Sequence, residues 1–233
     1  LAREQGFTST VCFPVGNLTP EGSVIKSTAI SPEVIDDDGV YRKTGPARVF
    51  HSEVEAIKAI KGQTDNPVKP GDVMVMCGRG PMGTGMEEVA QVTLALKHLS
   101  WGKEVALVTD ARFSGVSTGA CIGHVSPEAL AGGPIGKLRD GDLVRIVIDG
   151  PNLRGSLDLV GENGQEVSPE EGAEILKTRE TADGLQADPR LPKDTRLWAA
   201  LQNVSGGTWG GCVYDVDAIV NTLEAGQEAL SVE

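Results

Sequence analysis

Short runs of apolar residues, separated by turns, predict a domain built on many β-strands. The runs are rich in β-branched residues, and Gly, Pro or Asn lies between most of them, as is typical of strands joined by tight turns. We predict strands over 11–15, 23–28, 47–50, 72–77, 104–109, 143–148 and 156–160. Many short strands with few helices between them favour a barrel-like α/β domain over a doubly wound sheet.

Helices are predicted where apolar residues recur at helical spacing after a capping residue. Ser52 begins a helix that ends at Gly62, and a second helix spans 84–100 after a glycine-rich loop. Ser168 opens a capping box with Pro at the first helical position. Two further helices are predicted over 194–204 and from Asp215 onward. Helices therefore dominate the last part of the chain.

This change in pattern after Gly161 predicts two parts. Residues 1–160 are expected to form a β-barrel-like α/β catalytic domain, and residues 161–233 a helical extension packed on it. The chain has 233 residues and begins with Leu1 rather than Met. We therefore expect it to be a fragment of a longer protein.

Charge and cysteine usage narrow the function classes. The 21 Lys and Arg against 33 Asp and Glu give a net charge of −12, which opposes binding to nucleic acid or to an anionic membrane. No apolar run approaches the roughly 18 residues of a membrane span, so we expect a soluble, cytoplasmic protein. Its four cysteines contain no C-x-x-C pair, which predicts buried free thiols rather than a zinc site or a redox dithiol.

Many of the 30 glycines cluster beside polar side chains, most densely over residues 78–88. A glycine-rich loop that runs from a strand into a helix exposes amide donors to an anion. The loop lacks the Gly-Lys-Ser/Thr ending of a P-loop and the spacing of a dinucleotide fingerprint. Tight backbone packing and ligand binding both remain open for it.

Helical phase distinguishes Glu87 from Glu88 at the end of this loop. At about 100° per residue, Glu88 lies about 60° from the centre of the apolar stripe of the predicted helix and Glu87 about 160°. Glu88 is therefore expected to point toward protein and Glu87 toward solvent. An inward carboxylate needs a partner, and Mg²⁺ is one candidate, although acidic residues also simply complement a helix dipole.

Polar residues follow the predicted strand 104–109 and precede Pro127. Ser114, in a Ser-Gly turn, could be a nucleophile, a general base or only a turn former. A serine hydrolase is disfavoured because the G-x-S-x-G elbow is absent. Ser126 is expected to cap a short helix whose amino end could hold a carboxylate, and His124 to contact a substrate or to be structural.

Several stretches, taken together and in order, closely resemble the C-terminal part of the dihydroxy-acid and sugar-acid dehydratase family. The stretches that carry this resemblance are 16–26, 85–88, 110–115 and 123–128. Residues 194–201 and 206–209 resemble the D-xylonate dehydratase branch of that family rather than the branched-chain biosynthetic branch. The resemblance covers nearly the whole chain.

The resemblance implies an iron-sulfur, Mg²⁺-dependent hydro-lyase that converts a sugar acid into its 2-keto-3-deoxy acid. It implies Ser114 as the base and Glu88 as a Mg²⁺ ligand, although placing the ligand at Glu88 assumes a one-residue gap in the glycine loop. Val116 stands where some members have threonine, so substrate contacts are expected from Ser117 or Thr118, together with His124 and Ser126.

The same resemblance implies a swivelling β-barrel domain and a homo-oligomeric enzyme. The cluster cysteines and most Mg²⁺ ligands are expected in an amino-terminal part, so this chain alone is expected to be inactive. Two alternatives stay open: a dihydroxy-acid dehydratase of branched-chain amino-acid synthesis, and a non-catalytic carboxylate-binding module.

Overall fold

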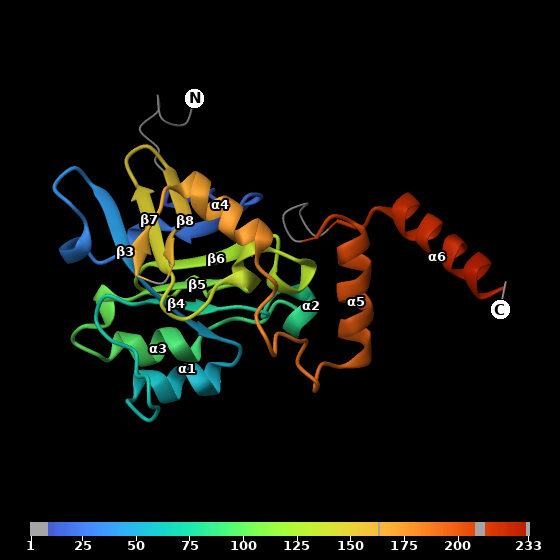
Figure 1. The fold of residues 1–233 in the computed structure, drawn as a ribbon, viewed down its shortest axis with the longest axis horizontal. Helices are drawn as coiled ribbons and strands as arrows, with labels where there is room; N and C mark the ends of the chain where they lie inside the picture. Colours follow the sequence, from blue (N-terminus) through green and yellow to red (C-terminus); the bar gives the residue numbers. More distant parts are fainter. Residues whose placement is uncertain (1–8, 163, 208–212, 232–233) are drawn as a thin grey trace.

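The computed structural model describes residues 9–162, 164–207 and 213–231. Most of these residues form one mixed β-sheet or pack around it (Figure 1). Its strand order is β1-β2-β6-β5-β4-β3-β7-β8-β9. The strands are β1 Val11–Cys12, β2 Gly22–Lys26, β3 Val40–Phe50, β4 Val73–Met76, β5 Ala106–Thr109, β6 Cys121–Ser126, β7 Leu143–Asp149, β8 Arg154–Glu162 and β9 Gln165–Glu166. Strands β3, β4, β5 and β6 run parallel where they pair, and the other pairs are antiparallel.

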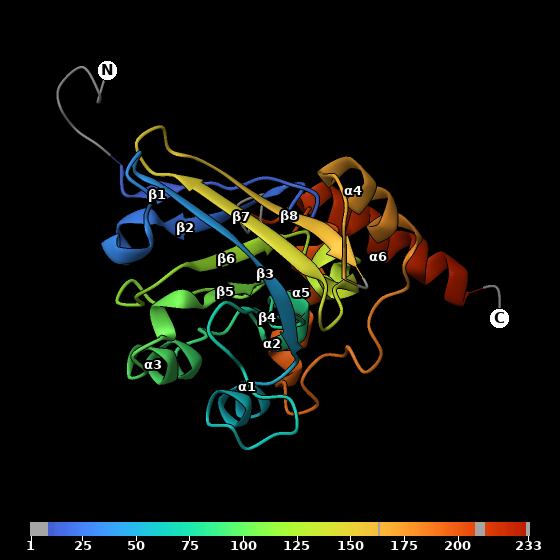
Figure 2. The same cartoon turned by 60° about the vertical axis from the view of Figure 1, so that its left-hand side comes forward.

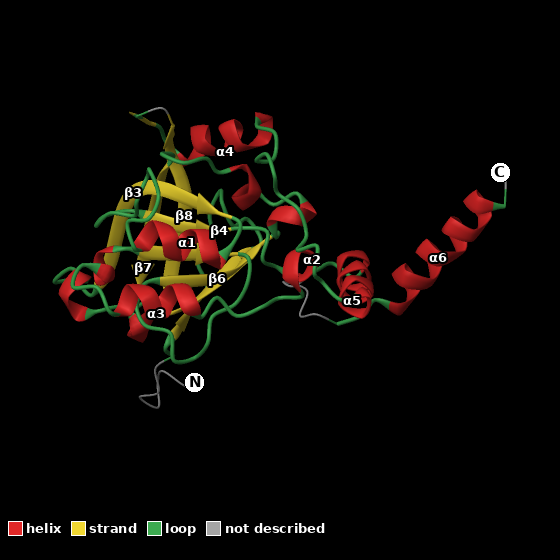
Figure 3. Cartoon of the chain, turned by 90° about the horizontal axis from the view of Figure 1, so that it is seen from below, coloured by secondary structure: helices red, strands yellow, loops and turns green. Residues whose placement is uncertain are grey.

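The helices lie on both faces of this sheet and beyond it. They are α1 Glu53–Ile60, α2 Pro81–Thr84, α3 Gln91–Lys97, α4 Pro169–Thr178, α5 Lys193–Val204 and α6 Val216–Leu230. Figure 3 shows α1 and α3 side by side over the sheet. Helix α4 packs on β8 and α5 packs on α2, whereas α6 extends away from the body. None of the described helices is both long and apolar enough to cross a membrane.

The long strand β3 joins two halves of the sheet (Figure 2). Its residues 40–46 pair antiparallel with β7, and its residues 47–50 pair parallel with β4. The sheet curls until β8 meets the loop after β1, where Val15 N–H donates to Gly155 O at 3.2 Å and Leu157 N–H to Val15 O at 3.3 Å. The result is a curled half-barrel, which confirms the expected barrel-like α/β class. The swivelling-domain likeness and the division at residue 160 stay predictions.

Alternating side chains of the strands fill two apolar layers. In β4, Val73 and Val75 lie inside the curl, while Met74 and Met76 lie against the helices. The pleat sends successive side chains to opposite faces, so a strand buried on both faces is a continuous apolar run. All four residues are fully buried. This explains why the runs at 72–77 and 104–109 contain no alternation of polar residues.

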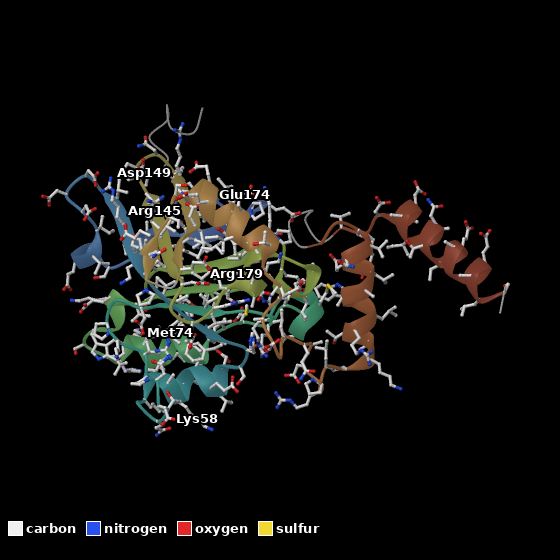
Figure 4. All side chains as sticks on the ribbon, in the orientation of Figure 1. Lys58, Met74, Arg145, Asp149, Glu174 and Arg179 are labelled. Atoms are coloured by element: carbon white, nitrogen blue, oxygen red, sulfur yellow. The ribbon has the colours of Figure 1, made fainter. Side chains whose placement is uncertain are left out.

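A buried arginine fastens α4 to the sheet (Figure 4). Arg179, directly after α4, donates from both terminal nitrogens to Asp142, one of them at 2.9 Å, and to Glu162 at 2.7 Å. Asp142 immediately precedes β7 and Glu162 ends β8. The side chains of Arg179 and Asp142 are only 8% and 4% exposed. One guanidinium therefore links the end of α4 to the start of β7 and the end of β8.

Most predicted helix starts are confirmed. Ser52 Oγ accepts from Glu55 N–H, Ser168 forms a full capping box with Glu171, and the carboxylate of Asp215 accepts from Ala218 N–H. Thr208, Trp209 and Cys212, on which other expectations rested, lie outside the described residues.

Two sequence-based assignments are wrong. The helix expected over 84–100 is interrupted, because Gly85 and Met86 are left-handed with φ of 70° and 64°, and residues 87–89 are not helical before α3 begins at Gln91. Ser126 does not cap a helix; it ends the interior strand β6, and Glu128 precedes the next short 3-10 helix. Tertiary strand pairing with β2 and β5 outweighs the capping signal of Ser-Pro here.

Candidate active site

The loops that follow β4 and β5 meet β6 at one edge of the sheet. Val89 N–H donates to Arg112 O at 2.9 Å, and Arg112 N–H donates to Glu87 O at 3.3 Å. His124 N–H donates to Ala111 O at 2.7 Å. Parallel strands carry their following loops to the same edge, which is where ligands gather in α/β folds. The stretches that contain Glu88, Ser114 and His124 are thus hydrogen-bonded into one surface.

A buried carboxylate, Asp110, holds these loops in place. It accepts hydrogen bonds from the amides of Gly78 at 3.0 Å, Arg79 at 2.9 Å and Ala129 at 2.9 Å. Burial raises the pKa of Asp110, and the three amides oppose that shift. The sequence analysis gave Asp110 no role, although its place directly after an apolar strand was a usable signal.

Glu128 supports the glycine loop from the other side. Both of its carboxylate oxygens accept from Met82 N–H at 3.1 Å, and a Cβ on Gly80 would lie 2.4 Å from one of them. A side chain at position 80 would therefore force Glu128 to shift from this position. Burial raises the pKa of Glu128 to about 7. The hydrogen bond from Met82 N–H lowers this pKa, and the negative charge of Asp110 raises it further.

Replacing Glu128 with Gln should flatten the pH dependence of stability. The folded-state pKa of about 7 lies above the ordinary 4.5, so the folded chain binds the extra proton and its free energy of unfolding falls as pH rises between these values. Glu128 should contribute about 1–3 kcal/mol to this fall, and the Glu128→Gln variant should lack that contribution. Urea unfolding of both chains at pH 5 and pH 8 measures it, and equal slopes would contradict the assignment.

Ser114 lies in a small hollow together with Ser117 and His124. The hollow has a volume of about 130 Å³ and is also lined by Lys26, Phe113 and Cys121. Ser114 O accepts from Ser117 N–H at 3.0 Å, and Ser114 Oγ accepts from Val116 N–H at 3.4 Å. Ser114 therefore does form a turn, and that turn aims an amide at its hydroxyl oxygen.

His124 occupies a strained backbone position beside this serine. Its φ is 54°, a left-handed value that non-glycine residues rarely adopt and that often marks functional sites. Burial, and secondarily the charge of Arg112, lowers the pKa of His124. A neutral imidazole is therefore favoured here, as a hydrogen-bonding group rather than a charge.

Thr118 and Ser126 do not reach the hollow. Thr118 is exposed and lines a neighbouring groove between α3 and residues 28–32. Ser126 is buried, and its Oγ donates to Glu21 at 2.8 Å. The substrate contacts expected from Thr118 and Ser126 therefore stay predictions, because neither side chain lines the hollow that contains Ser114.

The phase argument for Glu87 and Glu88 is wrong, because neither residue is helical. Glu88 is exposed and has no ion-pair partner within the ranges that the structure describes. Glu87 is partly buried and accepts from Arg79 Nε at 2.7 Å. The Arg79 pair had escaped the sequence analysis. Glu88 as a metal ligand stays a prediction, and its free carboxylate would suit that role.

The described residues alone do not assemble a metal centre. No group of three His, Cys, Asp or Glu side chains suited to a metal ion occurs among them. Cys12 and Cys77 are buried free thiols whose pKa is raised by burial, and burial raises the pKa of Cys121 to about 12. Iron-sulfur ligation requires thiolates. Cys12, Cys77 and Cys121 belong to no such group, so they do not fit a cluster, whereas the exposed Glu88 fits one oxygen ligand of a Mg²⁺ site.

Comparisons with known proteins match dehydratases. A family model described as dihydroxy-acid/6-phosphogluconate dehydratase C-terminal matches residues 7–184. D-xylonate dehydratase YagF of Escherichia coli K12 is 61% identical over 99% of this chain and 35% of the relative, and D-xylonate dehydratase YjhG is 60% identical over 94% and 33%. A dihydroxy-acid dehydratase of Dehalococcoides mccartyi is 49% identical over 64% and 25%. The chain spans about a third of the length of the first two relatives.

Proposed function

Because this chain belongs to the dihydroxy-acid/6-phosphogluconate dehydratase family, we propose that it is the C-terminal part of an enzyme that dehydrates D-xylonate to its 2-keto-3-deoxy acid. The supporting observation is the extent of the matches. The two D-xylonate dehydratases align over 99% and 94% of the chain, whereas the dihydroxy-acid dehydratase of D. mccartyi aligns over 64%. The longer matches thus favour the sugar-acid branch.

Ser114 takes the C2 proton in this proposal. As an alkoxide, Oγ receives the proton, the C2–H electron pair forms the C2–C3 double bond, and hydroxide leaves C3 with the C3–O pair. The Ser114 hydroxyl then protonates that hydroxide to water and regenerates the alkoxide, and the enol tautomerises to the keto acid. The Val116 amide at Ser114 Oγ supports this role, because such a donor stabilises negative charge on oxygen.

His124 and Ser117 would hold substrate hydroxyls beside Ser114, since all three line the same hollow. Glu88 would supply one ligand to Mg²⁺, with the remaining ligands and the iron-sulfur cluster held outside this chain. Mg²⁺, when bound, stabilises enolate charge on the substrate. No step above depends on the cysteines of this chain.

Replacing Glu88 with Gln should weaken Mg²⁺ binding in the complete enzyme. We expect the half-saturating Mg²⁺ concentration to rise roughly tenfold or more, because even groups that only orient metal ligands contribute 10- to 100-fold to affinity. Part of the lost rate should return at high Mg²⁺. The matched control is Glu87→Gln, which breaks the Arg79 pair but should leave the Mg²⁺ titration unchanged. If Glu87→Gln but not Glu88→Gln changed the Mg²⁺ titration, the metal ligand would be Glu87.

Substrate comparison tests the proposed activity itself. The complete enzyme should release a 2-keto acid from D-xylonate with a higher kcat/KM than from 2,3-dihydroxy-3-methylbutanoate. The reverse preference would assign it to the branched-chain reaction. Turnover of neither acid by enzyme with its metal centres loaded would favour a binding module.

A further inference from the structure

The hollow around Ser114 carries a positive charge to which the proposed reaction assigns no role. Among the described residues that line it, Lys26 is the only one with a full charge. His124 has a lowered pKa, and burial keeps the Cys121 thiol protonated. No carboxylate lines the hollow within the described ranges. The local field therefore favours an anion.

Strand pairing places this lysine beside the serine turn. Lys26 ends β2, which pairs antiparallel with β6 through Ile25 and Ile122. Its Nζ donates to Gly115 O at 3.3 Å. Gly115 follows Ser114 directly, so the ammonium is bound to the turn that presents the hydroxyl. Lys26 also closes the 16–26 stretch of the family resemblance.

An ordinary serine is too weak a base to remove a proton from carbon, so negative charge on Ser114 Oγ must be stabilised. The Val116 amide supplies one donor. A cation within about 4–6 Å of an ionising group favours its charged form by roughly 1–3 pH units. Lys26 is the described group that can supply such a charge from within the hollow.

We propose that Lys26 is a positioning residue of the reaction, whose ammonium holds the Ser114 turn and stabilises the alkoxide of Ser114. This inference rests on the proposed function, because it requires Ser114 to be the base. Lys26 keeps its proton throughout; the C2 proton moves to Ser114 and then to the departing hydroxide. The titratable groups facing Ser114 are His124 and Cys121 from β6 and Lys26 from β2, with Arg112 two residues before it.

The test is the pH profile of D-xylonate turnover by the complete enzyme carrying Lys26→Met or Lys26→Arg. Loss of the ammonium should lower kcat roughly 10- to 100-fold and shift the acid limb of the profile upward by about 1–2 pH units. Lys26→Arg keeps the positive charge, so its acid limb should lie within a few tenths of a pH unit of the wild-type position. The matched control is Lys43→Met, because Lys43 donates similarly to Glu104 O at 2.8 Å, away from the hollow.

Other outcomes overturn the inference. A raised KM with unchanged kcat in Lys26→Met would make Lys26 an anchor for the substrate carboxylate. Equal loss in the Met and Arg variants with no shift of the limb would make it merely structural. Either result, with Ser114→Ala inactive, leaves the proposed function standing. Full activity of Ser114→Ala would instead remove the proposed base, and the Lys26 inference with it.

Discussion

Replacing Ser114 with alanine is expected to lower turnover of the complete enzyme by roughly 10²- to 10⁴-fold, as is typical when a general base is lost. The substrate should still bind, because hydroxyl contacts from Ser117 and His124 are kept. The defect should not respond to added Mg²⁺, unlike that of Glu88→Gln. Stability should change little, because Ser114 is only half-buried and its Oγ accepts one long hydrogen bond.

Exchange of the C2 proton with deuterated solvent identifies the step that fails. Ser114→Ala should lose exchange and turnover together. Ser117→Ala, from the same hollow, should raise KM more than it lowers kcat, because it removes a hydroxyl contact and not the base. Near-normal exchange by Ser114→Ala would reduce Ser114 to a turn former.

Removing the Arg179 guanidinium should be the most destabilising single side-chain change among those considered. Arg179→Met leaves Asp142 buried and unpaired, and breaking a buried pair in this way costs about 3–5 kcal/mol. The matched control is Arg42→Met: Arg42 pairs with Asp36 and Asp38 on the surface, where its side chain is 49% exposed. That change should cost no more than about 1 kcal/mol.

Urea unfolding followed by circular dichroism compares the two arginine variants. Adding Asp142→Leu to Arg179→Met should recover part of the loss, because the uncompensated buried carboxylate is then gone. Equal losses for Arg179→Met and Arg42→Met would show that the buried pair contributes nothing beyond a surface pair.

The sequence predicted those parts of the fold that depend on interactions between residues close together in the chain. Ser52 and Ser168 were identifiable as helix caps because the acceptor and its amide lie three residues apart in sequence. The barrel-like class followed from the spacing of short apolar strands. Family motifs singled out Ser114 and His124, which the structure brings into one hollow.

Interactions between distant segments explain what the sequence analysis missed. The stripe Val89, Val92 and Leu96 is apolar at helical spacing, yet Val89 is not helical, and its amide donates instead to Arg112 O, 23 positions later. Strand β6 contains Gly123 and His124, which interrupt its apolar pattern, and only its neighbours β2 and β5 make it a strand. No pattern within a short window contains such pairings.

The dual pairing of β3 has a consequence for how the body of the molecule loses its structure. The first part of this eleven-residue strand pairs antiparallel with β7, and its last four residues pair parallel with β4. It therefore belongs both to the antiparallel half of the sheet and to the parallel half. Because one continuous strand carries both sets of pairings, we expect the two halves to unfold as one cooperative unit. Helix α6, with none of its residues buried, lies outside that unit and can fray independently. Amide hydrogen exchange would therefore divide this chain between its sheet and its last helix, not between the two halves of the sheet.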